Sequence, residues 1–305
     1  MYFCTKDGKM KLQTPVADSR CEVGISFNDK ITMLGSCFSD NIGRQLSDLG
    51  FDVCVNPFGT LYNPVSILQS VERLISRQEF VNEDAVCIGA GDERFCSFSH
   101  HTSFARAGMD EFIENANKAL QDAAAHFASS TKVIITLGTA WCFRHNTTGK
   151  VVSNCLKRPA AEFTRERLTV DQTAEALMKI MKMCQEEAAR SADFKQKEFI
   201  FTVSPIRHFK DGAHGNQLSK GTLLIGIDQA INDLRNIKAD YFPSYEIVMD
   251  ELRDYRFYAE DMCHPTQQTV DYIRERFLNR ALPSEEQSRL EDNIRSLKRS
   301  RHISL

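Results

Sequence analysis

The stretch ITMLGSCFSDNIGRQL, residues 31–46, joins two sequence patterns that belong to different kinds of secondary structure. Its first four residues are apolar or β-branched and show no alternation of polar and apolar side chains, which is typical of a strand buried on both faces. Ile42, Leu46 and Leu49 then recur at the spacing of one helix face. The stretch therefore predicts a buried strand that turns directly into a helix, with the Gly-Ser-Cys of residues 35–37 at the turn.

The same alternation of short apolar runs and longer helix-like segments continues along the chain. Further strands are predicted over residues 51–55, 132–137, 198–203 and 245–250, which are rich in Val, Ile or Phe. Helices are predicted over residues 38–49, 63–76, 111–127, 169–190 and 218–236. Strands that alternate with helices favour an α/β fold with right-handed crossovers. We therefore predict a three-layer α/β/α sandwich with a central parallel sheet.

The domain organisation is inferred from the chain length and from two breaks in this alternation. A chain of 305 residues can form one large α/β domain. We predict a single domain over residues 1–280, with insertions near residues 80–108 and 139–168, and a C-terminal helix and tail over residues 281–305. Within the second insertion, the Thr-Thr-Gly of residues 147–149 predicts a hairpin turn.

The composition argues against several classes of function. A net charge of −3 and a charged fraction of 26% give no electrostatic reason to expect binding to nucleic acid or to an anionic membrane. No apolar run reaches the length of a membrane span, and residues 1–12 lack the apolar core of a signal peptide. The sequence has neither a glycine-rich dinucleotide motif nor a P-loop, so we predict no cofactor.

The ten cysteines are scattered along the sequence and form no CxxC pair. Their spacing is not that of metal ligands, and several lie in apolar runs, which are typical of buried free thiols. We therefore predict free thiols, no bound metal and a reducing, cytoplasmic compartment. The sequence gives no signal for an oligomeric state.

Small and polar side chains follow each predicted strand at its carboxyl end. The segments after the five strands are residues 35–39, 56–60, 138–141, 204–208 and 260–265. Because the carboxyl ends of parallel strands meet at the edge where open α/β sheets bind ligands, we expect these segments to converge. Hydroxyl, imidazole and carboxylate groups are thus predicted to form one polar rim.

Ser36 has two interpretations at the turn after the first strand. A serine in this position is typical of a helix N-cap, which stabilises a helix by about 1 kcal/mol. A nucleophile there would place the helix N-terminus beside its developing oxyanion. Asp261 and His264 favour a nucleophile, because the DxxH spacing can set the carboxylate on one imidazole nitrogen and leave the other for Ser36. Ser, Asp and His in this chain order are a recurring triad order.

Several motifs together resemble those of the GSCFA family, whose name-giving motif reads Gly-Ser-Cys-Phe-Ser at residues 35–39. The other matching segments are NPFGTLYNP (56–64), LGTAW (137–141), VVSNCLK (151–157), SPIRHFKDGAHGNQLSK (204–220) and DELRDYRFYAEDMCHP (250–265). The family resembles the SGNH or GDSL-like hydrolases, which have a flavodoxin-like sheet and act on esters. This resemblance implies Ser36 as the nucleophile, His264 as the general base and Asp261 as the residue that orients it.

The resemblance also implies an oxyanion hole at this rim. Gly59 matches the glycine of the second SGNH block, whose N–H group is a donor. The third block supplies Gly138 without the usual asparagine, so Asn154 is the predicted substitute. Further substrate-binding candidates are Trp141, Arg207, His208 and Lys220. The structural alternative is that Trp141 fills the core and that the charged side chains face water.

The predicted function is that of a serine esterase that cleaves or transfers an O-acyl ester of a small molecule. An acylated carbohydrate is the substrate that many SGNH relatives suggest. Two alternatives remain open. Cys37, directly after Ser36, could be the nucleophile of a thioester enzyme. The missing asparagine is also compatible with a ligand- or glycan-binding protein that has lost its activity.

Overall fold

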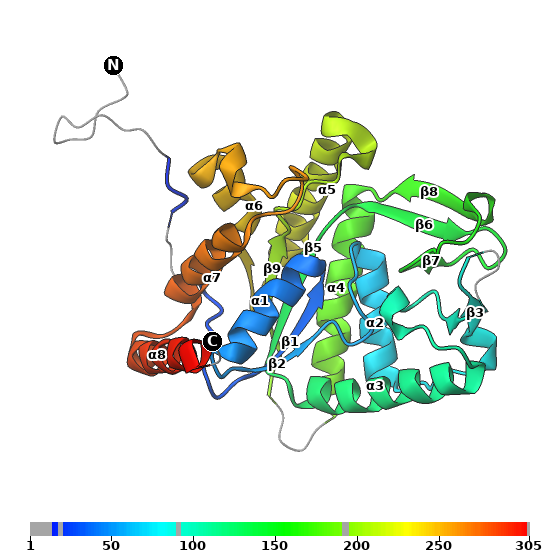
Figure 1. Cartoon of the computed structure of the whole chain (residues 1–305), viewed down its shortest axis with the longest axis horizontal. Helices are drawn as coiled ribbons and strands as arrows, with labels where there is room; N and C mark the ends of the chain where they lie inside the picture. Colours follow the sequence, from blue (N-terminus) through cyan, green and yellow to red (C-terminus); the bar gives the residue numbers. More distant parts are fainter. Residues whose placement is uncertain (1–13, 18–20, 90–92, 191–194, 304–305) are drawn as a thin grey trace.

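The computed structural model describes residues 14–17, 21–89, 93–190 and 195–303. At its centre is a five-stranded parallel sheet in the order β10-β9-β5-β1-β2 (Figure 1). Its strands are β1 Lys30–Gly35, β2 Asp52–Val55, β5 Lys132–Leu137, β9 Glu198–Val203 and β10 Ala239–Phe242. Counted along the chain this is the flavodoxin-like order, in which the direction of strand addition reverses between β1 and β5. The predicted α/β/α sandwich is confirmed.

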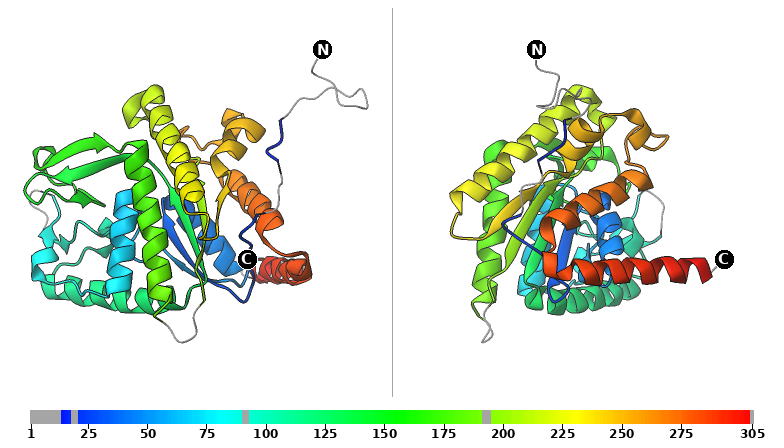
Figure 2. Two further views of the ribbon diagram at one scale, coloured as in Figure 1. Left: turned by 180° about the vertical axis from the view of Figure 1, so that it is seen from behind. Right: turned by 90° about the vertical axis from the view of Figure 1, so that its left-hand side faces the viewer.

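Helices cover both faces of the sheet (Figures 1 and 2). One face carries α2 Pro64–Ser76, α3 Met109–Ser129, α4 Val170–Ala188 and α5 Gly212–Asp233. The other carries α1 Cys37–Asp48, α7 Gln267–Ala281 and α8 Gln287–Ile303.

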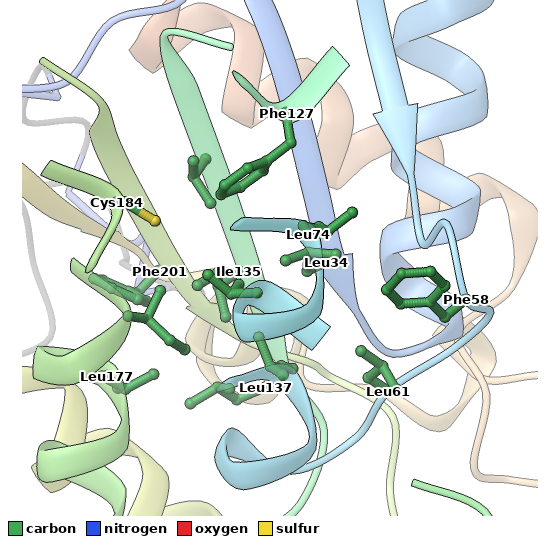
Figure 3. Packing of buried hydrophobic residues seen from close by; sticks show 14 of the residues in the cluster. Leu34, Phe58, Leu61, Leu74, Phe127, Ile135, Leu137, Leu177, Cys184 and Phe201 are labelled. Carbon is green, nitrogen blue, oxygen red and sulfur yellow. The ribbon is translucent and has the colours of Figure 1, made fainter. Parts of the chain in front are cut away.

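Successive strand residues enter the two hydrophobic cores in turn, so that Leu34 joins the first core and Met33 the second. Figure 3 shows part of the first core, where Leu34, Ile135 and Phe201 pack together with side chains from the helices. Because both of their faces are buried, β1, β5 and β9 appear in the sequence as continuous apolar runs, as predicted. The prediction of β2 is confirmed as well, although it is an edge strand whose residues are partly or fully exposed.

The fifth strand lies earlier in the chain than the sequence pattern predicts. Residues 245–250 are helical, in α6 Ser244–Glu246 and η5 Ile247–Leu252, and β10 takes the predicted place of this strand. The prediction is wrong because a short apolar run does not distinguish a buried strand from a buried helix. Asp240 interrupts the apolar pattern of β10 and hides the true strand.

Two small antiparallel sheets lie outside the central sheet. β6 Trp141–His145 pairs with β7 Val151–Val152 and β8 Phe163–Arg167, and this sheet extends from the carboxyl end of β5 (Figure 1). The turn predicted at residues 147–149 joins β6 to β7. β3 Val86–Cys87 pairs with β4 Phe95–Cys96 within the first predicted insertion. The predicted domain boundaries stay a prediction.

Short helical turns complete the fold. They are η1 Asn82–Asp84, η2 Thr102–Phe104, η3 Ala160–Glu162, η4 Phe209–Asp211, η6 Tyr255–Phe257 and η7 Ser284–Glu286. α5 begins at Gly212 rather than at residue 218, since glycines in its first turn resemble a loop in the sequence. The residues predicted to lack a signal peptide, 1–12, lie outside the described residues. Within the described part of the chain, no helix is long and apolar enough to cross a membrane.

Candidate active site

The turn between β1 and α1 lies at the point where the strand order reverses. Gly35 has a φ of +147°, and a Cβ atom built there would lie 2.2 Å from the carbonyl oxygen of Thr136 in the neighbouring strand β5. The Gly35 N–H group donates to Asn56 Oδ1 at 2.7 Å, and the Ser36 N–H group donates to Thr136 O at 3.2 Å. Only a glycine fits this close approach, so Gly35 fixes where Ser36 leaves the sheet.

Ser36 is the N-cap of α1. Its Oγ accepts a hydrogen bond from the Phe38 N–H group at 3.3 Å, and the residue has no exposed surface. The structural interpretation of Ser36 as a helix cap therefore holds in this conformation. Its position at the reversal point, where flavodoxin-like folds bind ligands, is also the one predicted for a nucleophile.

The loop after β2 is tied to this turn by an asparagine that the sequence analysis did not single out. Asn56 adopts a left-handed φ of +42° and donates from Nδ2 to Asp40 Oδ1 at 2.7 Å. Leu61 N–H donates to Gly35 O at 2.8 Å. Burial raises the pKa of Asp40, while its hydrogen bond to Asn56 opposes that rise. An asparagine directly after a buried strand was the available sequence signal for this link.

Asp261 and His264 form a pair on the loop before α7. Asp261 Oδ2 lies 2.5 Å from His264 Nδ1, and Asp261 Oδ1 accepts the N–H groups of Cys263 and His264, each at 2.9 Å. These two backbone hydrogen bonds, with the imidazole, lower the pKa of Asp261 to about 2. Because an ionised carboxylate only accepts hydrogen bonds, the neutral tautomer of His264 that fits this contact has its proton on Nδ1 and its lone pair on Nε2. Both side chains are about half exposed, at 51% and 53%.

The pair is not joined to Ser36 in this conformation. Among the described residues, the one hydrogen bond to Ser36 Oγ comes from Phe38, and none connects Ser36 with His264. The loop that carries His264 is nevertheless attached to the rim, since the Arg207 N–H group after β9 donates to Cys263 O at 3.1 Å. Its guanidinium also donates to Met262 O at 3.2 Å. Arg207 thus holds the His264 loop rather than projecting freely into solvent.

Lys220 is buried, with 1% of its surface exposed, although it is a lysine on a helix. Its Nζ donates to Gly138 O and to Ser204 O, both at 2.7 Å. It therefore ties together the carboxyl ends of β5 and β9, next to the turn that carries Ser36. Burial lowers the pKa of Lys220 to about 7, and the nearby Cys37 thiol opposes this shift.

The backbone donors predicted for the oxyanion hole are already used. The N–H groups of Gly138 and Thr139 both donate to Tyr62 O at 2.9 Å. The Gly59 N–H group donates to Asn56 O at 2.7 Å. Neither glycine therefore has a free N–H group for an oxyanion in this conformation. The bond of Gly59 closes a local turn over residues 56–59, whereas the partner of Gly138 comes from a loop that is distant in the sequence.

Asn154 and Trp141 belong to the small antiparallel sheet. Asn154 follows β7, and its Oδ1 accepts the Leu156 N–H group at 2.8 Å, which shapes the local loop. Trp141 begins β6, and the Arg165 guanidinium lies 4.2 Å from the centre of its ring. The structure therefore does not bring either side chain into hydrogen-bond contact with Ser36 or His264.

His208 lies on the loop after β9 and packs against the loop after β2. Its ring packs edge-on against the Tyr62 ring, with centroids 6.1 Å apart, and its N–H group donates to Asn216 Oδ1 at 2.9 Å. Its Nε2 is buried and has no hydrogen-bond partner among the described residues. Burial, together with the charges of Lys220 and His264, lowers the pKa of His208 to about 4, while Asp211 opposes this shift.

Cys37 packs partly buried against the second core. Burial and the Asp40 carboxylate raise the pKa of its thiol, while N–H groups of the helix N-terminus and the Tyr62 hydroxyl oppose that rise. A protonated thiol is a weak nucleophile. The environment of Cys37 therefore favours a packing role.

Comparison with known proteins gives one family and several chains of solved structures. One of these structures is an acetyl xylan esterase, Est2A, from the rumen bacterium Butyrivibrio proteoclasticus. It shares 12% sequence identity over 84% of this chain with a TM-score of 0.40, and this chain spans 63% of its length. No curated protein matches the sequence. The model of the GSCFA family matches residues 30–277, which is most of the chain and includes every side chain of the site. The chain belongs to the GSCFA family.

Proposed function

We propose that this protein is a serine hydrolase of the SGNH type, which cleaves or transfers an O-acyl ester. Ser36 is the nucleophile, His264 the general base and Asp261 the residue that orients His264. The observation that carries this proposal is the Asp261–His264 pair, with 2.5 Å between Oδ2 and Nδ1, on the rim of the sheet where Ser36 leaves β1. This tautomer leaves His264 Nε2 ready to accept a proton. The proposal involves neither a cofactor nor a nucleic-acid or membrane partner.

In the proposed reaction, Ser36 Oγ attacks the ester carbonyl carbon and its proton passes to His264 Nε2. The carbonyl oxygen becomes the oxyanion of a tetrahedral intermediate. As this intermediate collapses, His264 gives the proton to the leaving oxygen, and the alcohol departs from an acyl-serine. Water, or the hydroxyl of an acceptor, then attacks the acyl-serine with His264 again as the base. The products are an acid or a new ester, and free Ser36.

Access to Ser36 requires a rearrangement. The residue has no exposed surface and its Oγ is bonded to the Phe38 N–H group. We infer that substrate binding breaks this bond and brings His264 Nε2 to about 3 Å from Ser36 Oγ, since catalytic hydrogen bonds often tighten only in the complex.

A polar cavity next to the turn supports a hydroxylated substrate, such as an acylated carbohydrate. The cavity has a volume of about 410 Å³ and is lined by Asp40 and by Asn56, whose Oδ1 accepts the Gly35 N–H group of the turn. Arg44, Thr60 and His101 also line it. Carboxylate, guanidinium, amide and hydroxyl groups together offer both donors and acceptors to sugar hydroxyls.

Covalent labelling tests the proposed function and the nucleophile together. A fluorophosphonate probe is expected to modify Ser36, because phosphonylation follows the same attack and proton transfer as the reaction. Peptide mapping by mass spectrometry should place the label on Ser36. Labelling should disappear in Ser36→Ala and persist in Cys37→Ala, which is the matched control at the neighbouring position. A label on Cys37 would instead support the thioester enzyme.

A ligand-binding protein without activity is the second candidate. The observation that favours it is the engagement of the Gly59 and Gly138 N–H groups in loop contacts. It predicts that the folded protein takes up no fluorophosphonate. That outcome would overturn the hydrolase proposal.

Asp261→Asn is expected to lower kcat for p-nitrophenyl acetate by about 10²–10⁴. The amide Oδ1 can still accept the N–H groups of Cys263 and His264, so the loop keeps its shape. The amide Nδ2 donates where the carboxylate accepted, so His264 carries its proton on Nε2 and cannot accept one from Ser36.

Steady-state kinetics and a thermal melt measure this effect. Asp254→Asn is the matched control, because Asp254 also caps a short turn, with Oδ1 accepting the Arg256 N–H group at 2.9 Å. The control should keep the kcat of the unaltered protein. A kcat of Asp261→Asn within threefold of that value would show that Asp261 does not orient the base.

A further inference from the structure

The proposed reaction places a negative charge on the substrate carbonyl oxygen, and serine hydrolases stabilise this charge with prearranged hydrogen-bond donors. The N–H groups of Gly59 and Gly138 donate to Asn56 O and Tyr62 O, respectively. Asn154 holds its own loop after β7.

Among the candidate side chains, Trp141 Nε1 and His208 Nε2 are buried without a hydrogen-bond partner among the described residues. Trp141 belongs to the small antiparallel sheet and stacks with the Arg165 guanidinium, whereas His208 lies on the loop directly after β9. His208 is therefore the candidate donor to the oxyanion.

His208 has an unused donor position. Its Nε2 is buried without a partner among the described residues, whereas its backbone N–H group is held by Asn216 at 2.9 Å. A buried polar nitrogen without a partner costs free energy, and native structures retain such groups where function requires them. The unpaired nitrogen therefore points to a partner that arrives with the substrate.

The neighbours of His208 connect it to both sides of the proposed site. Its ring contacts the ring of Tyr62, whose carbonyl oxygen accepts the first two N–H groups after β5, those of Gly138 and Thr139. The Tyr62 hydroxyl lies close enough to the Cys37 thiol to shift its pKa, and Cys37 directly follows Ser36. On the other side, the N–H group of Arg207, the residue before His208, donates to Cys263 O at 3.1 Å, one residue before His264. His208 thus lies on a loop that is attached to the loop of the proposed general base and that packs against Tyr62.

Burial, assisted by two cationic groups, favours the neutral form of the His208 ring. Lys220 Nζ is fixed at the ends of β5 and β9, and His264 becomes cationic when it takes the proton from Ser36. Together with burial, these charges lower the pKa of His208 to about 4, while Asp211 opposes them. A neutral imidazole with its proton on Nε2 donates a hydrogen bond and does not compete with His264 for the proton of Ser36.

We propose that His208, as a neutral imidazole, donates a hydrogen bond from Nε2 to the oxyanion and replaces the asparagine of other SGNH hydrolases. The inference rests on the proposed function. No proton leaves His208: as the Ser36 Oγ–carbon bond forms, the carbonyl π electrons move to the oxygen and the Nε2–H group stabilises them. Lys220 acts as a positioning residue, because its Nζ holds Ser204 O at the end of β9, where the loop that carries His208 begins.

The test compares His208→Phe, which keeps a planar ring without a donor, with His208→Gln, which keeps a donor on a side chain of similar length. His208→Phe is expected to lower kcat for p-nitrophenyl acetate by about 10²–10³ with KM within a few-fold. His208→Gln should retain kcat within about tenfold of the unaltered protein. Melting temperatures should stay close, since Nε2 makes no bond within the protein. His214→Phe, at an exposed position of α5, is the matched control and should have no effect.

The pH profile separates a donor from a base. If His208 only donates, His208→Gln keeps the shape of the kcat profile and changes its height. A variant profile that loses its acidic limb would make His208 the base and overturn the inference. A kcat of His208→Phe within twofold of the unaltered protein would overturn it as well. An equal loss of kcat in His208→Gln and His208→Phe would also overturn the inference, because it would show that His208 has a structural role.

Fluorophosphonate labelling separates this inference from the proposed function. If one of these results is found but Ser36 is still labelled, the proposed function stands and only the role of His208 is wrong. If the unaltered protein is not labelled, the proposed function and the inference are both wrong.

Discussion

Ser36→Ala is expected to lower kcat for a short-chain p-nitrophenyl ester by about 10⁴–10⁶. Alanine has no oxygen to form the acyl intermediate, and the Asp261–His264 pair, which remains in place, can only activate water directly. The measurement is steady-state hydrolysis together with the burst of p-nitrophenol that an acyl-enzyme produces. The burst should vanish along with turnover.

A control is needed because Ser36 is also a helix cap. Removal of its Oγ leaves the Phe38 N–H group without its acceptor and should destabilise α1 by about 1 kcal/mol. Thr169→Ala is the matched control, since Thr169 caps α4 by accepting the Gln172 N–H group at 3.1 Å and lies outside the site. It should lose similar stability and keep full activity. If Ser36→Ala kept more than a tenth of the native kcat, Ser36 would be a cap and not the nucleophile.

Gly35→Ala is expected to lower the free energy of unfolding by about 3–5 kcal/mol, which makes it the largest stability effect in this set. The φ of +147° is strained for any residue with a side chain, and the new Cβ would lie 2.2 Å from Thr136 O. The obstacle is backbone of the neighbouring strand, so no side-chain rotation relieves it. Relief requires β1 and β5 to separate at the reversal point of the sheet, which also displaces Ser36.

Urea unfolding followed by circular dichroism measures this loss. Gly221→Ala is the matched control, because nothing lies within 4 Å of a Cβ built there and the residue is inside α5. In a helix, alanine is favoured over glycine by up to about 1 kcal/mol, so the control should be neutral or more stable. A Gly35→Ala protein with native stability would mean that the turn can adopt another path, and the rigid placement of Ser36 would then be wrong.

Sequence patterns predict those parts of this fold that are encoded locally. Strands buried on both faces, such as β1 and β5, show an uninterrupted apolar run, and Asn63 before Pro64 marks the start of α2. Asn63 Oδ1 indeed accepts the Ser66 N–H group at 2.9 Å. β10 is not predicted, because half of its four residues are only partly buried and one of them is Asp240. The apolar run over residues 245–250 is predicted as the strand instead.

The candidate site is encoded locally only in part. Asp261 and His264 lie on one turn, so their spacing alone predicts that they can meet. The Gly138 N–H group is not free to bind an oxyanion, because it donates to Tyr62 O from a different loop. No short motif contains both residues. Lys220 illustrates the same limit. Its burial follows from two carbonyl oxygens at strand ends that are distant in the sequence.

The Lys220 clamp divides the rim into a stiff part and a compliant part. The buried Nζ of Lys220 donates two short hydrogen bonds, one at the carboxyl end of β5 and one at that of β9. These two strand ends therefore resist being moved apart. Arg207 attaches the loop that carries His264 through its own N–H group and its guanidinium, which donate to backbone carbonyl oxygens near the surface. Breaking these bonds costs less free energy than breaking the buried bonds of Lys220. We therefore expect the His264 loop to move when substrate enters, while the ends of β5 and β9 stay in place. The general base would then travel to the nucleophile, and not the nucleophile to the base.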